Sequence, residues 1–120
     1  MTIIATILVV LVAILHLGFL VLEMFLWSGP IGRRVFGLSP EVMKGSAPLA
    51  ANQGLYNGFL AAGLLWGVIL GAAGFSICVF FLICVIIAGV FGAATAKRSI
   101  LWFQALPGAL ALVFTLMFRP

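Results

Sequence analysis

Residues 2–27 read TIIATILVVLVAILHLGFLVLEMFLW. The only strongly polar side chains in this stretch are His16 and Glu23, and it is longer than the roughly 20 apolar residues that a transmembrane helix needs. A cleaved signal peptide is not favoured, because the first residues carry no basic side chain and the apolar run is too long. The stretch therefore predicts a first membrane-spanning helix over residues 2–27.

The composition of the whole chain points to the same class. Of its 120 residues, 66% are hydrophobic and 7% are charged, whereas soluble domains have about 25% charged residues. A soluble monomer is excluded by this balance. The 14 glycines fit helices that pack closely in lipid, so we expect an integral membrane protein whose main surrounding is the bilayer.

Three further apolar segments predict spans at about residues 49–73, 75–96 and 100–118. The fold class expected is all-α: one four-transmembrane-helix bundle over residues 1–120, with short loops and one longer loop at residues 28–48. The connections at Ala73 and at Lys97 are so short that consecutive helices there should be antiparallel neighbours. Within the long loop, Ser39, Pro40 and Glu41 form a helix-start pattern that predicts a short interfacial helix.

The basic residues predict the orientation of the spans. Five of the six cations fall in the first and third loops, and one falls on the opposite side: Arg33, Arg34, Lys44, Lys97 and Arg98 against Arg119. By the positive-inside rule, both basic loops face the cytoplasm and both chain ends lie outside. The net charge of +4 is not arranged as a basic stripe with interleaved aromatic residues, so no nucleic-acid partner is expected.

Two polar side chains lie on one face of the first predicted helix. His16 and Glu23 are seven residues apart, which places them within roughly 20° of each other, about 16 and 6 Å along the axis from Trp27. Polar groups at such depths mark ligand or proton pathways. Two structural alternatives remain open: Glu23 pairs with Arg33 or Arg34 near the interface, and His16 is a neutral imidazole bonded to a neighbouring helix.

The second predicted helix opens with ANQGLYNG at residues 51–58. Asn52 and Tyr56 share one helix face, and Gln53 and Asn57 share the next. Amides and phenols of this kind often only hold helices together. Their predicted depth matches that of Glu23, however, and in the fourth helix Gln104 lies at the same level. The candidate ligand or proton pocket therefore comprises His16, Glu23, Asn52, Gln53, Tyr56, Asn57 and Gln104.

Small residues on the second predicted helix indicate close helix packing. Gly54 and Gly58 form one ridge, and Gly63, Gly67 and Gly71 form another on a different face. Core packing is the plain reading of both ridges.

In the fourth helix Pro107 has no N–H group, so the carbonyl of Phe103 is expected to be free.

Metal and cofactor chemistry is not expected. One histidine, one nearby glutamate and amides do not supply the three or four ligands of a zinc site, and haem ligation fails similarly. Cys78 and Cys84 are six residues apart, about 120° around a helix, so they read as buried free cysteines. No Ser/His/Asp set is present for nucleophilic catalysis.

Three functions remain in view. A binding protein or proton-coupled carrier for an unknown small molecule would use Glu23 as the titrating group and His16 as the next relay. It would need at least a homodimer, because a lone four-helix bundle fills its own centre. A membrane enzyme acting on a lipophilic substrate would use the same two residues as acid and base. A non-catalytic helper of partner membrane proteins would use the polar residues only to hold helices together. Binding or transport is the favoured hypothesis.

Four blocks carry a resemblance to a known family: LHLGFLVLEMFLW from Leu15, GRRVFGLSPE from Gly32, LAANQGLYNGFLAAGLLWG from Leu49 and AGVFGAATAKRSILWFQALPGALAL from Ala88. Together they resemble the bacterial and fungal integral-membrane family known as domain of unknown function one-three-zero-four, over nearly the whole chain. The resemblance implies a four-helix protein of the bacterial inner (plasma) membrane. It assigns no catalytic or binding residues.

Overall fold

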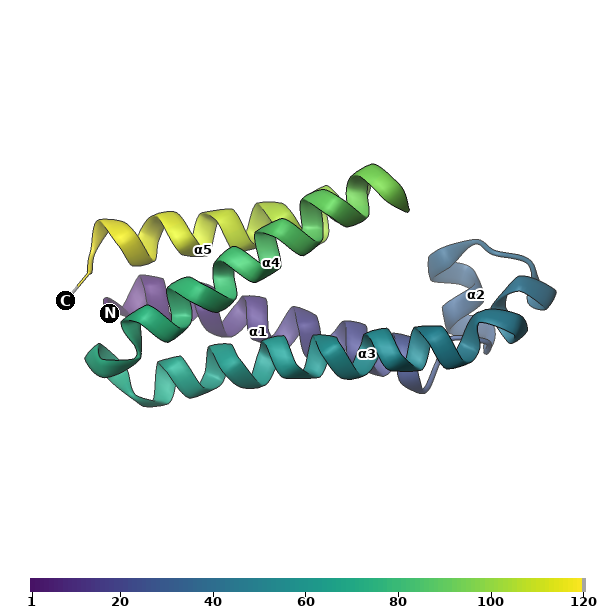
Figure 1. The fold of residues 1–120 in the computed structure, drawn as a ribbon, viewed down its shortest axis with the longest axis horizontal. Helices are drawn as coiled ribbons and strands as arrows, with labels where there is room; N and C mark the ends of the chain where they lie inside the picture. The colour runs from purple at the N-terminus through teal and green to yellow at the C-terminus, as the bar shows by residue number, and fades with distance from the viewer. Residues whose placement is uncertain (120) are drawn as a thin grey trace. The chain divides into compact units, whose positions relative to one another are not determined.

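The computed structural model describes residues 1–119, and in that range the chain is entirely α-helical with short 3-10 and π segments (Figure 1). The elements are α1 (Ile3–Met24), α2 (Pro30–Phe36), α3 (Pro40–Ile69), the 3-10 helix η1 (Gly71–Gly74), α4 (Phe75–Thr95), the π-helix η2 (Leu101–Ala105) and α5 (Leu106–Met117). The all-α class expected from the sequence is confirmed.

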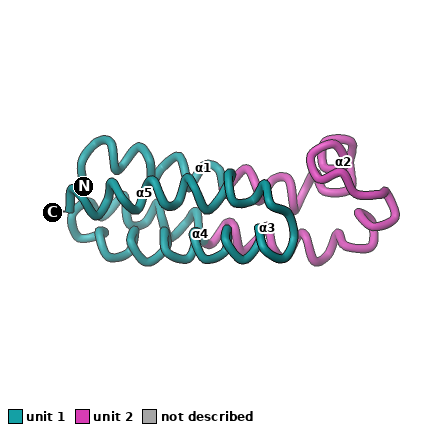
Figure 2. The backbone as a smooth tube through the Cα atoms, turned by 90° about the horizontal axis from the view of Figure 1, so that it is seen from above, with its two compact units in different colours: residues 1–15, 60–120 teal, residues 16–59 magenta. Residues whose placement is uncertain are grey.

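The helices form two compact units, shown in separate colours in Figure 2. Unit 1 comprises Met1–Leu15 and Leu60–Pro120, and unit 2 comprises His16–Phe59. Both α1 and α3 contribute residues to each unit. The unit boundaries therefore lie within continuous helices and not in loops.

The core of unit 1 is made of small and branched apolar side chains from α1, α3, α4 and α5. Its fully buried members are Val9, Val12, Ala13, Ala61, Leu64, Cys78, Leu82, Val85 and Ala111. α4 packs along both α5 and η2. Thr115, a buried hydroxyl of this unit, donates to the Ala111 carbonyl of its own helix at 2.7 Å, so this bond does not link two helices.

Glycines let the helices of unit 1 approach closely. A Cβ atom at Gly63 would overlap the ring of Phe81. A Cβ atom at Gly67 would lie 2.5 Å from Cys78 Sγ, and one at Gly89 would lie 2.5 Å from the backbone nitrogen of Ala105. The contact at Gly89 is with backbone, which cannot move aside as a flexible side chain can. Close helix packing in unit 1 thus depends on glycine having no side chain at these positions.

Gly71 forms part of a turn and does not take the packing role expected of it. α3 ends at Ile69, before Gly71, and a Cβ atom on Gly71 would meet nothing within 4 Å. Its φ of +63° lies in the left-handed region that glycine adopts without strain. Gly71 makes the turn between α3 and α4 possible, which is why it does not continue the ridge of Gly63 and Gly67.

Unit 2 contains a helix that the sequence analysis assigned to a loop. Residues 28–48 hold α2 and the first turns of α3. α2 begins with Pro30 and ends at Phe36. The next residue, Gly37, has a φ of +67°, and its N–H donates to the Arg33 carbonyl. Proline at a helix start and glycine just past its end form a recognised pair of boundary signals. These two residues could have revealed α2.

α3 begins where the helix-start pattern predicted, but it does not stop after a short interfacial turn. The backbone N–H of Val42 donates to Ser39 Oγ at 3.3 Å, and Pro40 is the first helical residue. The helix then continues through Pro48 to Ile69 over 30 residues. The prediction of a separate interfacial helix is therefore wrong. Proline removes one backbone hydrogen bond, and here a single lost bond does not end the helix.

Two helical stretches are long and apolar enough to cross a membrane, Ile3–Met24 and Gly71–Thr95, and the apolar stretch Leu101–Met117 is shorter. α3 has the length, but its polar residues at positions 52, 53, 56 and 57 lower its hydropathy. The fourth apolar segment changes geometry in its course. The N–H of Leu106 donates to the Leu101 carbonyl five residues earlier, which gives a π turn directly before Pro107, where the proline cannot supply the ordinary bond.

Candidate functional site

Glu23 lies in the last turn of α1, and its carboxyl group is bonded across to α3. The side chain is 7% exposed, and Asn57 Nδ2 donates a hydrogen bond to Glu23 Oε1. Asn57 is itself 8% exposed. The Gln53 side chain, one turn earlier on α3, lies close to the Glu23 carboxyl. Two amides that are four residues apart on α3 therefore lie beside one buried acid.

Glycine on α3 is what brings the two helices this close. A Cβ atom at Gly54 would lie 2.6 Å from Met24 Cγ, 3.1 Å from Glu23 Cβ and 3.2 Å from the Leu20 carbonyl oxygen. One turn later, a Cβ atom at Gly58 would lie 2.8 Å from Leu20 Cδ1. Small residues at such positions allow backbones to approach. The Gly54 and Gly58 ridge therefore sets the distance over which Asn57 reaches Glu23.

The guanidinium partners considered for Glu23 are not used in the described part of the chain. Arg33 and Arg34 lie in α2 with both side chains exposed, whereas amides hold the Glu23 carboxyl. The axial distances from Trp27 also need correction. α1 ends at Met24 and residues 25–29 form turns, so Trp27 does not continue the axis of α1.

His16 is buried within unit 2, on the same face of α1 as Glu23. Its exposure is 0%, and its ring meets Phe19 edge to face with centroids 5.2 Å apart. Among the described residues, no buried side-chain nitrogen or oxygen lacks a hydrogen-bond partner. The imidazole is therefore accommodated in the interior as a bonded group, about two helical turns before the acid along α1.

Three further residues belong to the predicted pocket. Asn52 and Tyr56 are exposed, and the Tyr56 ring lies beside Phe59 with centroids 6.0 Å apart. Gln104 belongs to η2 in unit 1, where it is half-buried. Unit 2 thus brings Glu23, Asn57 and Gln53 together and turns the other face of the polar segment outward.

Sequence reasoning missed a second polar contact in unit 2. Trp27 Nε1 donates to Ser46 Oγ at 3.1 Å, while Ser46 donates to the Val42 carbonyl at 2.6 Å. The Trp27 ring also packs on Phe36 of α2, with centroids 4.5 Å apart. These contacts tie the turn after α1 to α2 and to the start of α3. A tryptophan at a helix end usually marks the membrane interface. That pattern gives no sign of the contacts of Trp27 with Ser46 and Phe36.

Metal-ligating groups do not cluster in the described residues: no set of three or more His, Cys, Asp or Glu side chains comes together there. Cys78 is buried and Cys84 is half-buried, and both are free. Cys78 Sγ lies 3.9 Å from the Leu64 carbonyl oxygen as a weak donor. Both cysteines occupy α4, in the unit that does not contain Glu23.

Together, the apolar helices and the buried acid with its amide partners define the class: an all-α protein with long apolar helices and a single buried carboxyl group at a helix contact. The chain belongs to the family described as Protein of unknown function (DUF1304), whose model matches residues 10–116. The family membership inferred from the four sequence blocks is thereby confirmed.

A relative in Lactococcus lactis subsp. lactis (strain IL1403), described as "Uncharacterized protein YpaA", is 33% identical over 115 residues. The match covers 94% of this chain and 97% of the relative. No solved structure matches the chain. The two chains are thus similar over almost their whole lengths.

Proposed function

We propose that the protein is a four-span protein of the bacterial inner membrane, with residues 28–48 and the turn at Lys97 in the cytoplasm and both chain ends outside. The spans are α1, the part of α3 from Leu49 to Ile69, α4, and η2 with α5. Support comes from the apolar stretches of α1 and α4 and from the five cations in the two proposed cytoplasmic segments. α3 reaches the required length, because 21 residues remain between positions 49 and 69.

We further propose that Glu23 and Asn57 form the centre of a site that binds or transports a small molecule. The observation that carries this proposal is a buried carboxyl group bonded to an amide at a contact between two apolar helices. An acid inside a span costs about 2.5 to 3.5 kcal/mol at the bilayer centre and less near the interface. Such residues mark substrate or proton pathways by default.

The chemistry of the site favours a small molecule that carries a positive charge as the ligand. Glu23 and Glu41 are the two acids of the chain, and Glu41 is exposed in the first turn of α3. The amides of Asn57 and Gln53 donate hydrogen bonds but do not neutralise charge. A ligand that brings a positive charge to Glu23 removes the main cost of keeping the carboxylate within the bilayer.

A pathway through the membrane is expected to need two or more copies of the chain. A lone four-helix bundle fills its centre with side chains, as unit 1 does with its buried Leu64, Leu82 and Val85. Large apolar side chains also face outward along α1, for example Ile7 at 53% and Ile14 at 55% exposure. A homodimer or larger assembly is therefore part of the proposal.

Native mass spectrometry of the detergent-purified protein tests the proposal through the Glu23→Gln variant. Glutamine keeps the shape of Glu23 and one acceptor oxygen for Asn57, but it removes the charge and the exchangeable acid proton. We expect the wild type to be a dimer or larger that retains a small non-lipid molecule, and we expect Glu23→Gln to lose that molecule. Glu41→Gln is the matched control, because it removes the exposed acid, and it should behave as wild type.

A ligand-free protein whose Glu23→Gln variant is indistinguishable from wild type would overturn the binding proposal. It would favour the helper hypothesis, in which the polar groups only hold helices together. If the retained molecule is chemically converted by the wild type but not by Glu23→Gln, the protein is the membrane enzyme that forms the runner-up hypothesis.

A further inference from the structure

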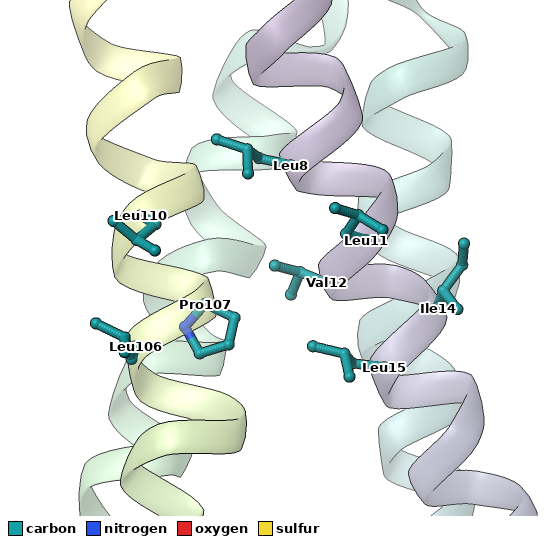
Figure 3. Close-up of a pocket in the computed structure, with 8 residues that line it drawn as sticks. All are labelled: Leu8, Leu11, Val12, Ile14, Leu15, Leu106, Pro107 and Leu110. Carbon is teal, nitrogen blue, oxygen red and sulfur yellow. The ribbon is translucent and has the colours of Figure 1, made fainter.

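A groove of about 350 Å³ lies between α1 and α5, within unit 1 (Figure 3). From α1, the side chains of Leu8, Val12 and Leu15 point toward Pro107 of α5. Every lining residue is apolar, and the full set is Leu8, Leu11, Val12, Ile14, Leu15, Leu106, Pro107 and Leu110. The compact ring of Pro107 stands where a longer side chain would occupy this space.

The groove is open to the surroundings of the protein. Leu11 is 50% exposed, Leu106 is 43% exposed and Leu110 is 47% exposed. The proposed membrane placement, on which this inference rests, puts these side chains in the hydrocarbon region. An apolar groove at that depth fits a flexible hydrocarbon chain better than a compact polar solute.

A basic turn lies between α4 and η2, and the chain continues from it into the α5 residues that line the groove. Lys97 and Arg98 are both exposed, between the end of α4 at Thr95 and the start of η2 at Leu101. Leu106 and Leu110 follow Leu101, the first residue of η2, by five and nine residues, which is about 8 and 14 Å along a helix at 1.5 Å per residue. One leaflet of the hydrocarbon core is about 15 Å thick, so a lipid acyl chain is long enough to cover this distance.

Aromatic side chains occupy the stretch between the basic turn and the groove. Trp102 and Phe103, both in η2, are each 60% exposed. Tryptophan is enriched at the depth of lipid headgroups, where its ring lies between the apolar and polar layers. Basic, aromatic and apolar residues therefore follow one another along the chain in the same order as the phosphate, glycerol and acyl layers of a phospholipid leaflet.

We propose that this part of unit 1 is a binding site for an anionic phospholipid of the cytoplasmic leaflet. One acyl chain lies in the groove between α1 and α5, and the phosphate is bound by Lys97 and Arg98. Each basic residue near the membrane surface contributes about 1 kcal/mol toward anionic lipid, so the pair corresponds to a preference of about 30-fold over a zwitterionic lipid. The site is separate from Glu23, which belongs to unit 2.

Lipid retention measured by native mass spectrometry tests this site. The full-length protein is placed in nanodiscs with equal amounts of phosphatidylglycerol and phosphatidylcholine, released, and examined for bound lipid. We expect the wild type to retain mainly phosphatidylglycerol. The double variant Lys97→Gln with Arg98→Gln should lose that preference, and the matched double variant Arg33→Gln with Arg34→Gln, in α2, should keep it.

A second pair of variants separates the groove from the charge. Leu110→Phe fills the groove and should reduce retained lipid of both types, whereas Val113→Phe, at a position on α5 that is 50% exposed and outside the groove lining, should not. Added inorganic phosphate should leave the retained lipid in place, because it has no acyl chain. Displacement by phosphate would show a simple anion site and overturn the proposal.

Equal retention of the two lipids by wild type, or equal losses from the two basic double variants, would also overturn the lipid site. Neither outcome affects the small-molecule proposal, which depends on Glu23→Gln. Conversely, Glu23→Gln should retain phosphatidylglycerol as wild type does. Failure of the protein to remain in membranes after carbonate extraction would overturn the membrane placement itself.

Discussion

In unit 1 the helices meet mainly through apolar side chains and glycines, whereas in unit 2 the contacts between segments include a carboxyl, an amide and an indole. Unit 1 places Leu82 and Val85 at 0% exposure in its core. Unit 2 bonds Asn57 to Glu23 and Trp27 to Ser46. Packing in unit 1 is thus a matter of shape, and packing in unit 2 also needs every polar group to find its partner.

The difference teaches where to look for function in a chain of this kind. Apolar shape complementarity is sufficient to hold helices together, as unit 1 demonstrates with its glycines and branched side chains. A buried acid is not needed for that purpose and is costly in lipid. The proposed binding role gives a reason for its presence in unit 2.

The largest effect is expected from a cavity in unit 1. Leu82→Ala removes a side chain that is 0% exposed and should lower the free energy of unfolding by about 3 kcal/mol, because core truncations leave a void. Equilibrium unfolding in mixed micelles, followed by circular dichroism, measures this loss. The adjacent Ile83→Ala, at a position that is 43% exposed, should be nearly neutral, and equal losses in the two variants would mean that the unit 1 core is not the one described.

The next largest effect is expected from a methyl group added where α4 contacts η2. Gly89→Ala places Cβ against the Ala105 backbone and should cost about 2 kcal/mol in the same unfolding measurement, since overpacking forces backbone shifts. Gly18→Ala is the control, because nothing lies within 4 Å of its Cβ position. A Gly89→Ala variant as stable as Gly18→Ala would refute close packing between α4 and η2.

Loss of the amide partner in unit 2 should have a smaller effect. Asn57→Leu leaves the buried Glu23 carboxyl without the hydrogen bond from that side chain and should cost about 1.5 kcal/mol in unfolding free energy, the typical price of an unmade buried hydrogen bond. Asn52→Leu, which changes an exposed amide on the same helix, should have little effect. Similar losses from both would indicate that the polar segment acts only through its general hydrophilicity.

The smallest effect is expected at the Trp27–Ser46 hydrogen bond, which joins the turn after α1 to the start of α3. Trp27→Phe keeps an aromatic ring beside Phe36 but removes the indole donor to Ser46. We expect a loss of about 0.5 to 1 kcal/mol, together with faster hydrogen exchange of backbone amides in α2. Ser46→Ala should give a similar loss that does not add to the first, and full additivity would argue against a shared hydrogen bond.

The helical class and the close glycine contacts of unit 1 could be predicted from sequence, because apolar runs and small-residue spacing are local patterns. α2 could not be recognised by hydropathy, since seven residues between turns carry no periodic signal, although Pro30 and Gly37 mark its ends. The uninterrupted course of α3 through Pro48 was also missed. The loop was expected to extend to residue 48, but α3 continues through Pro48 although proline removes one backbone hydrogen bond.

The candidate site could be predicted only in part for a related reason. Seven-residue spacing correctly places His16 and Glu23 on one face of α1, and both are buried. Sequence could not say that Asn57 reaches the acid while Asn52 and Tyr56 face outward. That choice depends on how α3 is rotated about its axis, which Gly54 sets through its contact with Glu23 and Met24.

The central claim is that Glu23 and Asn57 are paired for function and not to hold unit 2 together. The unfolding free energy of the double variant Glu23→Leu with Asn57→Leu tests it most directly, because replacing both partners by apolar side chains leaves no buried group unsatisfied. We predict that this variant is at least as stable as wild type. A loss equal to or greater than that of Asn57→Leu alone would contradict the account and show that the pair is structural.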